Sequence, residues 1–250
     1  DEADQMLDMG FIHALRQIAP LLAEDRQTML FSTTMPKQMG EIAGAYLRDP
    51  VRVEAARPGK AADKVKQSLH FVPQPGKKAL LIKLLGEHKG ERALVFHRTK
   101  HGAEKLMKDL VKAGFDAASI HGNKSQGQRD RAIVGFKSGQ ITVLVATDVA
   151  ARGLHIDDVA YVYNFDLPNV PDNYVHRIGR TARAGAEGIA ISFCAEHEMG
   201  ELRDIERTMK NRIPVASGDA WAVAVEPKKG KPGNNRRRPR RRNGGNRRAA

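Results

Sequence analysis

Cysteine is almost absent from the sequence, since Cys194 is the only one in 250 residues. A single thiol cannot form a disulfide within the chain and cannot supply a cysteine cluster for a metal ion. This usage fits a reducing, cytoplasmic setting. No run of 18 or more apolar residues occurs, which argues against a membrane-spanning helix. The acidic first residues also lack the basic start and apolar stretch of a secretory signal.

Acidic residues are missing from residues 227–250, which contain 11 of the 42 lysines and arginines. The remaining 31 bases face 29 acids, so the formal net charge of +13 belongs to this tail and the body carries only +2. Arginine forks match phosphate groups, and such a tail therefore indicates a polyanion partner. A merely solubilising tail is the alternative. The six arginines between Arg236 and Arg242, interrupted only by Pro239, favour the polyanion.

Beyond about residue 66, short apolar segments alternate with amphipathic helical patterns. Apolar residues recur at helical spacing within Leu80–Leu85 and Ala103–Val111, and each segment predicts a helix. A third helix is predicted to begin at Ser125, whose hydroxyl and Gln128 fit a capping box, and to end near Gly139. This alternation is typical of an α/β fold, a RecA-like or flavodoxin-like parallel sheet with helices on both faces. The predicted strands are Ser68–Val72, Ala93–Phe96, Ala117–Ile120, Val143–Ala146, Val159–Tyr163 and Ile189–Phe193.

The first 50 residues show a different pattern, two helices on either side of one short strand. Phe11, Leu15, Ile18 and Leu22 predict the first helix, and a strand is expected around Thr28–Phe31. Pro36 fits the first position of the second helix, which should end before Asp49-Pro50. These elements are too few to close a sheet of their own.

The chain therefore divides into five parts. We expect an incomplete unit at 1–50, a basic linker at 51–65, the α/β domain at 66–211, an extension at 212–226 and a disordered basic tail at 227–250. In the extension, Trp221 either docks on the domain or belongs to the tail.

The most specific stretch runs from Tyr174 to Gly185 and reads YVHRIGRTARAG. Arg177, Arg180 and Arg183 recur at three-residue spacing, so on a helix their guanidinium groups would share one face. Such a cluster is unfavourable unless an anion neutralises it, and phosphoryl-transfer sites use arginine to stabilise charge on a γ-phosphate. A solvated basic face is the alternative. The interleaved glycines and the strand that follows favour an anion site.

This stretch resembles motif VI of the DEAD-box RNA helicases, and other segments resemble further motifs of that family in the same order. Asp1-Glu2-Ala3-Asp4 matches motif II, which names the family. The resemblance covers residues 1–194, and Lys60–Val65 together with the basic tail indicates the bacterial RhlE-like branch. The remaining matches are Ser32-Thr33-Thr34 (motif III), Val95–Thr99 (motif IV), Gln126 with Arg129 (the Q-x-x-R element), Ala146–Gly153 (motif V) and His176–Arg183 (motif VI).

The resemblance implies a helicase C-terminal RecA-like domain preceded by the end of the ATP-binding domain, with ATP and Mg²⁺ as cofactors. Asp1 would hold Mg²⁺ through water, and Glu2 would position the attacking water. The catalytic arginines would be Arg180 and Arg183. Contacts to ATP are implied for Gly153, His155, Arg180 and Arg183. Contacts to RNA are implied for Thr99, His121, Gly122, Gln126, Arg129, Thr147 and Arg152. Interdomain coupling is implied for Ser32, Thr34, Asp148, His176 and Arg177.

Several of these residues also suit ordinary structural roles. The D-E-A-D segment in isolation could be a solvated acidic end of the chain. Ser32 and Thr34 could cap a helix as readily as couple two domains, and Thr99 precedes a helix that it could cap. A lone histidine such as His121 is more often structural than functional.

Two positions depart from the family pattern. Thr33 replaces the alanine of the usual Ser-Ala-Thr, which adds one hydroxyl and should have a small effect. His155 stands where the family tends to have an aspartate that meets the ATP ribose. A neutral imidazole can hydrogen-bond to a hydroxyl but brings no negative charge, so this substitution puts the ribose contact in doubt.

The function implied by the resemblance is that of an ATP-dependent helicase that binds single-stranded RNA and opens short duplexes. The sequence contains no G-x-x-x-x-G-K-S/T phosphate loop and starts at motif II. We therefore expect a fragment whose nucleotide-binding domain lies upstream in the same protein. A non-catalytic RNA-binding module is the alternative, and it is what we expect of the fragment alone. A DNA translocase is a third possibility, which the D-E-A-D and H-R-I-G-R-T motifs disfavour.

Deleting residues 227–250 should flatten the salt dependence of RNA binding. The tail contains no Phe, Tyr or Trp to stack on bases, so it should bind phosphates without sequence preference. Single strands give a slope of about −0.7 per neutralised phosphate, and engaging half of the eleven cations would give a log–log slope of about −4. A salt titration of RNA affinity with and without the tail checks this. Identical slopes would show that the tail serves solubility alone.

Overall fold

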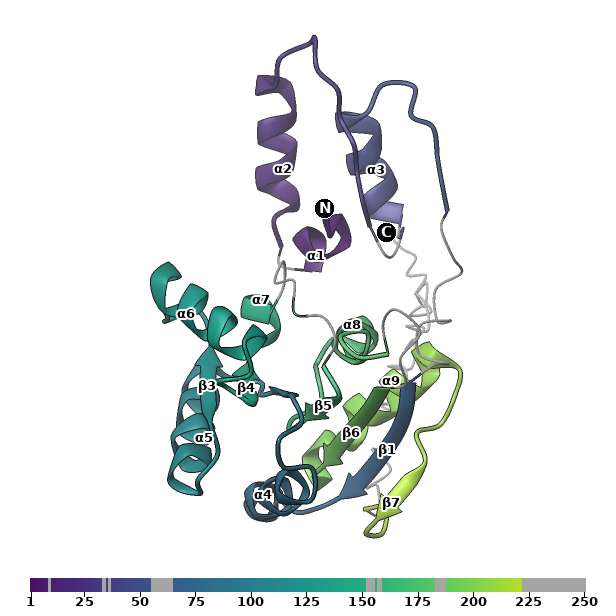
Figure 1. The fold of residues 1–250 in the computed structure, drawn as a ribbon. Helices are drawn as coiled ribbons and strands as arrows, with labels where there is room; N and C mark the ends of the chain where they lie inside the picture. Colours follow the sequence, from purple (N-terminus) through teal and green to yellow (C-terminus); the bar gives the residue numbers. More distant parts are fainter. Residues whose placement is uncertain are drawn as a thin grey trace, which may run out of the picture.

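The computed structural model describes residues 1–8, 10–32, 35, 37–54, 65–151, 156, 159–182 and 188–221. Its centre is a seven-stranded sheet in the order β3-β4-β2-β5-β6-β1-β7, in which every neighbouring pair is parallel (Figure 1). No helix in the described part of the chain is long and apolar enough to cross a membrane. The strands are β1 (Val65–Phe71), β2 (Ala93–Phe96), β3 (Ala117–Ile120), β4 (Val143–Ala146), β5 (Tyr161–Asn164), β6 (Gly188–Cys194) and β7 (Val215–Ser217). The helices that accompany the sheet are α4 (Lys77–Glu87), α5 (Lys100–Lys112), α6 (Gln126–Lys137), α7 (Asp148–Ala151), α8 (Pro171–Ile178) and α9 (Met199–Met209).

Both faces of the sheet are covered, because successive side chains of a strand point to opposite sides. In β2, Ala93 and Val95 pack in one core with leucines of α4 and α5. Leu94 and Phe96 pack in a second core with α6 and α7. A third core joins α8 and α9 to β1 and β6. All four residues of β2 are buried, which is why this strand reads as a continuous apolar run.

The strands and helices expected from residue 66 onward are confirmed, with boundaries that differ by a few residues. The α/β class with helices on both faces is confirmed as well. The sequence pattern missed β7, whose three residues are all exposed and show no apolar alternation. This strand forms because β1 leaves an open edge with which it can pair. Of the two alternatives for Trp221, docking is confirmed, since its Nε1 donates to the carbonyl of Cys194 at 3.3 Å.

Cys194 ends β6 inside the third core and is fully buried. Burial raises the pKa of its thiol to about 12. The side chain therefore acts as a small apolar group at ordinary pH, since the thiolate is the reactive form.

The N-terminal elements form a small cluster of their own (Figure 1). Ala3, Leu15, Met39 and Ile42 are its buried centre. The elements are α1 (Ala3–Asp8), α2 (Ile12–Ile18), the 3₁₀ turn η1 (Ala19–Leu21) and α3 (Lys37–Tyr46). Both helices expected here are confirmed; the first continues into η1, and Pro36 lies outside the described residues.

The strand expected at Thr28–Phe31 was wrong. Among the described residues this segment pairs with no strand. The carbonyl of Phe31 accepts one backbone hydrogen bond, from the amide of Ala3 at 3.0 Å. An apolar run can become a strand only where a neighbouring strand supplies a ladder of hydrogen bonds.

The predicted capping box at the start of α6 is confirmed. Ser125 Oγ accepts from the Gln128 amide at 3.4 Å, and Gln128 Oε1 accepts from the Ser125 amide at 3.0 Å. Beyond the other end of the helix, Gly139 adopts a φ of +81°, a left-handed conformation that glycine reaches without strain. Local sequence therefore fixes both ends of this helix.

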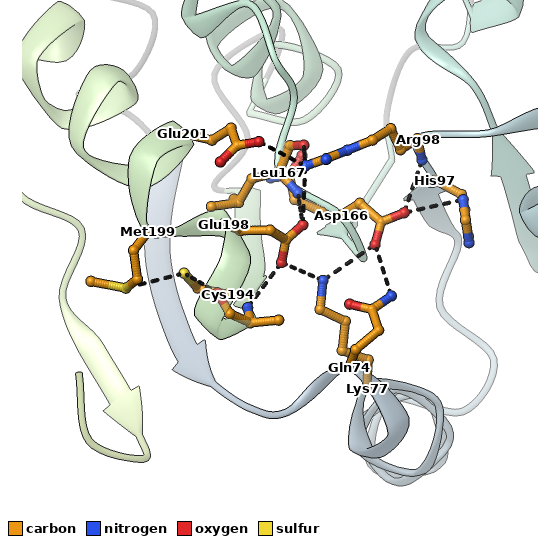
Figure 2. A network of polar contacts seen from close by, with 12 residues as sticks. Gln74, Lys77, His97, Arg98, Asp166, Leu167, Cys194, Glu198, Met199 and Glu201 are labelled. Atoms are coloured by element: carbon orange, nitrogen blue, oxygen red, sulfur yellow. Dashed lines mark hydrogen bonds and ion pairs between the residues drawn. The ribbon is translucent and has the colours of Figure 1, made fainter. Parts of the chain in front are cut away.

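A buried charge network joins α4 to the ends of β5 and β6 (Figure 2). Lys77 has a fully buried side chain and donates to Glu198 at 2.5 Å and to Asp166 at 3.2 Å. Glu198, also fully buried, accepts from the amides of Leu167 and Ala195, at 3.0 and 2.9 Å. Burial alone would raise the pKa of Asp166, but nearby His97, Lys77 and the Arg98 amide lower it. The network therefore holds the segment after β5 in a fixed position.

Replacing Lys77 with alanine should destabilise the fold strongly. It would remove the fully buried cation that Glu198 and Asp166 share and leave Glu198 only its longer pair with Arg98, at 3.4 Å. Breaking a buried ion pair costs roughly 3–5 kcal/mol. Lys78, its neighbour on α4, pairs with Asp109 at 3.0 Å but keeps a 51% exposed side chain. Lys78→Ala should therefore cost about 1 kcal/mol or less. Denaturant unfolding of both variants provides the measurement, and equal losses would contradict the role assigned to the buried network.

Candidate functional site

Four neighbouring strands end at the same edge of the sheet, and predicted site residues follow three of them. His121 follows β3, Thr147 follows β4, and Thr99 lies three residues beyond the end of β2. Asp166 lies two residues beyond the end of β5, the fourth strand. In open parallel sheets the carboxyl ends of the strands form the usual ligand-binding edge. The parallel pairing therefore gathers residues that are up to 67 positions apart in the sequence.

Arg177 is almost completely buried at this edge, with 1% exposure. Its Nε and Nη2 donate to the two carboxylate oxygens of Asp148 at 2.6 and 2.8 Å. Its Nη1 donates to Asn164 Oδ1 at 3.1 Å and to the carbonyl of Asp166 at 2.7 Å. The guanidinium group also lies 4.9 Å from the ring centroid of Phe96, a favourable cation–π arrangement. Arg177 is therefore neutralised within the domain and joins α8 to α7 and to the end of β5.

Arg177 and Arg180 do not share one helical face, and Arg183 lies outside the described residues. Helix α8 ends at Ile178, so Arg180 lies in the turn beyond it. The positive φ of Ala182, 57°, carries the chain further from helical geometry. Half-buried Arg180 and His176 instead line a shallow depression beside α8, together with Phe96, Asp148 and Ala151. The three-residue spacing therefore did not predict how Arg177 and Arg180 are placed, and the anion site stays a prediction.

Thr99 is the N-cap of α5, which was the alternative to a contact with RNA. Its hydroxyl accepts from the amide of Gly102 at 3.1 Å, and its own amide donates to His97 Nδ1 at 3.1 Å. The residue is exposed at the edge of the sheet. A contact of Thr99 with RNA stays a prediction, and the capping bond already engages one lone pair of its oxygen.

His121 is buried, with 4% exposure, and its predicted contact with RNA stays a prediction. Its Nε2 lies 3.1 Å from Glu104 Oε2, and its Nδ1 accepts from the amide of Asn123 at 3.3 Å. Both ring nitrogens therefore have partners inside the protein. Gly122, next in the chain, is exposed, and nothing lies within 4 Å of the position that a Cβ would take.

The first turn of α6 presents Gln126 and Arg129 beside this segment. Gln126 is exposed and donates to Asp130 at 2.8 Å. Arg129 is half-buried, and its Nη2 lies 3.5 Å from the carbonyl of His121. Its Nε is buried and has no hydrogen-bond partner within the described part of the chain. A helix N-terminus with an arginine of this kind suits a phosphate group.

The N-terminal cluster brings motif II and motif III together. Ser32 Oγ accepts from the amide of Asp4 at 3.2 Å, so it bonds to the start of α1. Asp1 is exposed and accepts from the Glu2 amide at 2.8 Å, and Glu2 adopts a positive φ of 50°. Ser32 thus satisfies a free amide of a helix that lies far from it in the sequence. Thr34, its predicted companion, lies outside the described residues.

Comparison with known proteins gives the family of this chain. The family described as "Helicase conserved C-terminal domain" matches residues 76–185, and "DEAD/DEAH box helicase" matches residues 1–42. An "ATP-dependent RNA helicase RhlB" from a Shewanella species is 43% identical over 225 residues, which are 89% of this chain and 51% of that protein. An "ATP-dependent RNA helicase CshA" from Listeria monocytogenes is 43% identical over 224 residues, 90% of this chain and 43% of that protein.

Solved structures agree with the sequence matches. The E. coli DEAD-box protein SrmB, bound to regulator of ribonuclease activity A, is 40% identical with a TM-score of 0.59. That match covers 61% of this chain and 91% of the SrmB chain. S. cerevisiae Dbp5 bound to RNA and ADP BeF3 is 31% identical with a TM-score of 0.73, over 86% of this chain and 58% of Dbp5. The chain belongs to the DEAD-box family of RNA helicases.

The chain spans about half the length of the curated DEAD-box relatives that it matches. The matching relatives include proteins named RhlB and CshA. The assignment to the RhlE-like branch stays a prediction.

Several DEAD-box motif residues lie outside the described part of the chain. They are Thr34, Arg152, Gly153, His155 and Arg183. Of the other predicted residues, Thr147 directly precedes α7 and is 8% exposed, and its carbonyl accepts from the amides of Ala150 and Ala151. The roles assigned to all of these residues stay predictions.

Three residues of this edge were not identified from the sequence. Asn164 and Asp166 bind Arg177, and Glu104 binds His121. Asn164 and Asp166 could have been noticed in the sequence, because Asn164 ends a buried apolar strand and Asp166 follows it. Buried polar side chains at such positions usually have hydrogen-bond partners. No sequence feature pointed to Glu104, since an acid on an amphipathic helix usually faces water.

The Glu104 carboxylate should make stability depend on acid pH. Hydrogen bonds from Lys124 and Ser119 lower the pKa of Glu104 to about 2, from 4.5. A carboxyl whose pKa is depressed by folding contributes stability that is complete above about pH 4.5 and is lost as the pH falls towards 2. Wild type should therefore be more stable than Glu104→Gln at pH 6, and this difference should shrink between pH 4.5 and 2. Denaturant unfolding across this pH range checks the sign; a constant difference would contradict it.

Proposed function

We propose that the chain is the C-terminal half of an ATP-dependent RNA helicase that unwinds short duplexes. The observation that carries this proposal is the arrangement at the carboxyl edge of the sheet. Arg180 and His176 line a depression on the α8 side. Arg129 and the first turn of α6 lie beyond β3 on the other side. A sheet edge with two separate basic regions suits a protein that binds a nucleotide and a nucleic acid at the same time.

On the nucleotide side, the residues present fit ATP with Mg²⁺. Asp148 neutralises Arg177, Arg180 lines the depression, and a guanidinium fork suits phosphate oxygens. Asp1 offers an exposed carboxylate, the ligand type that Mg²⁺ takes together with water and phosphate oxygens. Bound Mg²⁺ would neutralise charge on the phosphates. Glu2 would orient the attacking water, and Arg180 with Arg183 would stabilise charge on the transferring phosphate.

The remaining nucleotide and coupling residues are proposed from motifs V and III. Gly153 and His155 would contact the nucleotide, and Arg152 would contact RNA. Ser32, Thr34 and the Arg177–Asp148 pair would link nucleotide state to domain closure. The phosphate loop that this chain lacks would come from an N-terminal RecA-like domain of the same protein.

On the RNA side, Arg129 carries the proposal. Its partly unsatisfied guanidinium group and the N-terminus of α6 offer donors to a backbone phosphate. Thr99, Gly122, Gln126 and Thr147 would contribute further contacts from the same edge. The basic tail would hold RNA near this edge and raise its local concentration. His121 would support the RNA-binding segment from inside, since its ring nitrogens are already bonded.

The test measures RNA-stimulated ATP hydrolysis and duplex unwinding by the whole protein with and without Arg180→Lys. Lysine keeps the charge but loses the planar fork, so kcat should fall by roughly 10³ while RNA affinity without nucleotide stays the same. Arg207→Lys is the matched control, because Arg207 is an exposed arginine of α9 paired with Asp204. That control should leave both quantities unchanged.

Two results would contradict the proposal. Absence of RNA-stimulated hydrolysis in the whole protein would reject the helicase function. Weaker RNA binding by Arg180→Lys with an intact kcat would place Arg180 on the RNA side.

A further inference from the structure

Glu104 is an acidic residue at an edge that is otherwise arranged for a polyanion. It lies on α5, and its Oε2 alone has three partners. Ser119 of β3 donates to it at 2.7 Å, His121 Nε2 lies 3.1 Å away, and Lys124 Nζ lies 2.8 Å away. One carboxylate oxygen thus joins a helix, the end of a strand and the segment that follows the strand.

These contacts fix the tautomer of His121. The Nδ1 atom accepts from the Asn123 amide, so it carries no proton in the neutral ring. The proton is then on Nε2, which donates to Glu104. The amide of Lys124 also donates to the carbonyl of His121 at 3.0 Å. Glu104 therefore holds the turn His121–Lys124 by binding the side chains at both of its ends. It accepts from His121 Nε2 and pairs with Lys124.

The turn leads directly into the proposed RNA-binding helix. Ser125, the next residue, is the N-cap of α6, and the Arg129 guanidinium group lies against the carbonyl of His121. A displacement of the turn would therefore move the cap and the support of Arg129 together. Phosphate contacts are sensitive to such displacements, because hydrogen bonds weaken steeply with distance and angle.

We propose that Glu104 is a positioning residue for RNA binding, which acts through His121 and Lys124 and does not touch RNA itself. This inference rests on the proposed binding of RNA by Arg129 and the first turn of α6. The inference predicts that removing this acid changes RNA affinity in the opposite direction from the one that its charge alone would give. If charge alone mattered, removing an acid beside the RNA path would tighten RNA binding. If positioning dominates, removing the carboxylate oxygens must weaken it.

Two substitutions separate these effects, since both remove the same charge. Glu104→Gln keeps an oxygen acceptor at the same reach and should bind single-stranded RNA within about threefold of wild type. Glu104→Ala removes every contact and should bind about tenfold more weakly than Glu104→Gln, the loss expected for about one hydrogen bond. The measurement is the RNA affinity of the 250-residue chain at one fixed salt concentration. Equal affinities of the two variants would overturn the inference.

Two further variants identify the cause of any change. Asp109→Ala removes another acid of α5, one that pairs with Lys78, and should leave RNA affinity unchanged. Arg129→Ala reports on the proposed function: if it binds RNA as wild type does, the proposed RNA edge is wrong. If Arg129→Ala weakens binding while both Glu104 variants agree, only the inference about Glu104 is overturned.

Hydrogen exchange distinguishes positioning from a general loss of stability. The amides of Asn123 and Lys124, both bonded to His121, should exchange faster in Glu104→Ala than in wild type. The amides of β2 and β4 should exchange at the wild-type rate. Faster exchange throughout the sheet would show a general loss of structure and would overturn the positioning role.

Discussion

Parallel strand pairing is the constraint on which this molecule depends. Strands that run in the same direction need a crossover between them, and here each crossover is a helix that covers a face of the sheet. Because both faces of the sheet are buried, its polar side chains can reach a ligand only at the strand ends. The order β3-β4-β2-β5 then sets which segments become neighbours at the carboxyl edge. Thr99, His121 and Thr147 all lie at that edge although none of them is close to another in sequence.

The charged groups behind that edge are paired, and this makes the edge rigid. Lys77 lies between Glu198 and Asp166, and Arg177 lies against Asp148. The two systems are linked by Asp166, whose carboxylate accepts from Lys77 and whose carbonyl accepts from Arg177. The end of β5 is thus held from the α4 side and from the α8 side at once. A ligand at the edge would meet side chains whose positions are already determined.

Ion pairs at this edge lie close to a guanidinium group that is only partly hydrogen-bonded. Asp148 and Glu104 are acids near the proposed anion sites, and each pairs with a base. They hold Arg177 and Lys124 in place and reduce the local repulsion between neighbouring cations. Arg129 keeps a donor without a protein partner within the described residues. The acids at this edge thus fix the positions of neighbouring bases, and this Arg129 donor is the one that we propose for a phosphate.

The sequence by itself determined the elements of the sheet and the identity of the motifs. The strands β2, β3 and β4 were predictable because they are short apolar runs between helices, and α6 was predictable from its Ser125–Gln128 cap. Such features depend on residues within one turn or one strand of each other. The short β7 and the extended Thr28–Phe31 segment were not predictable, because a strand exists only where another segment offers it a partner.

Only the tertiary structure decided which partners the motif residues have within the protein. His121 has the sequence appearance of an RNA ligand, yet Glu104, 17 residues earlier, binds one of its ring nitrogens. The three arginines of motif VI look equivalent, yet Arg177 is buried against Asp148 whereas Arg180 lies in a turn beyond the end of α8. Residue type fixes which bonds a side chain can form. Burial and distant partners fix which of those bonds remain for a ligand, and both depend on the packing of segments that the local sequence does not place.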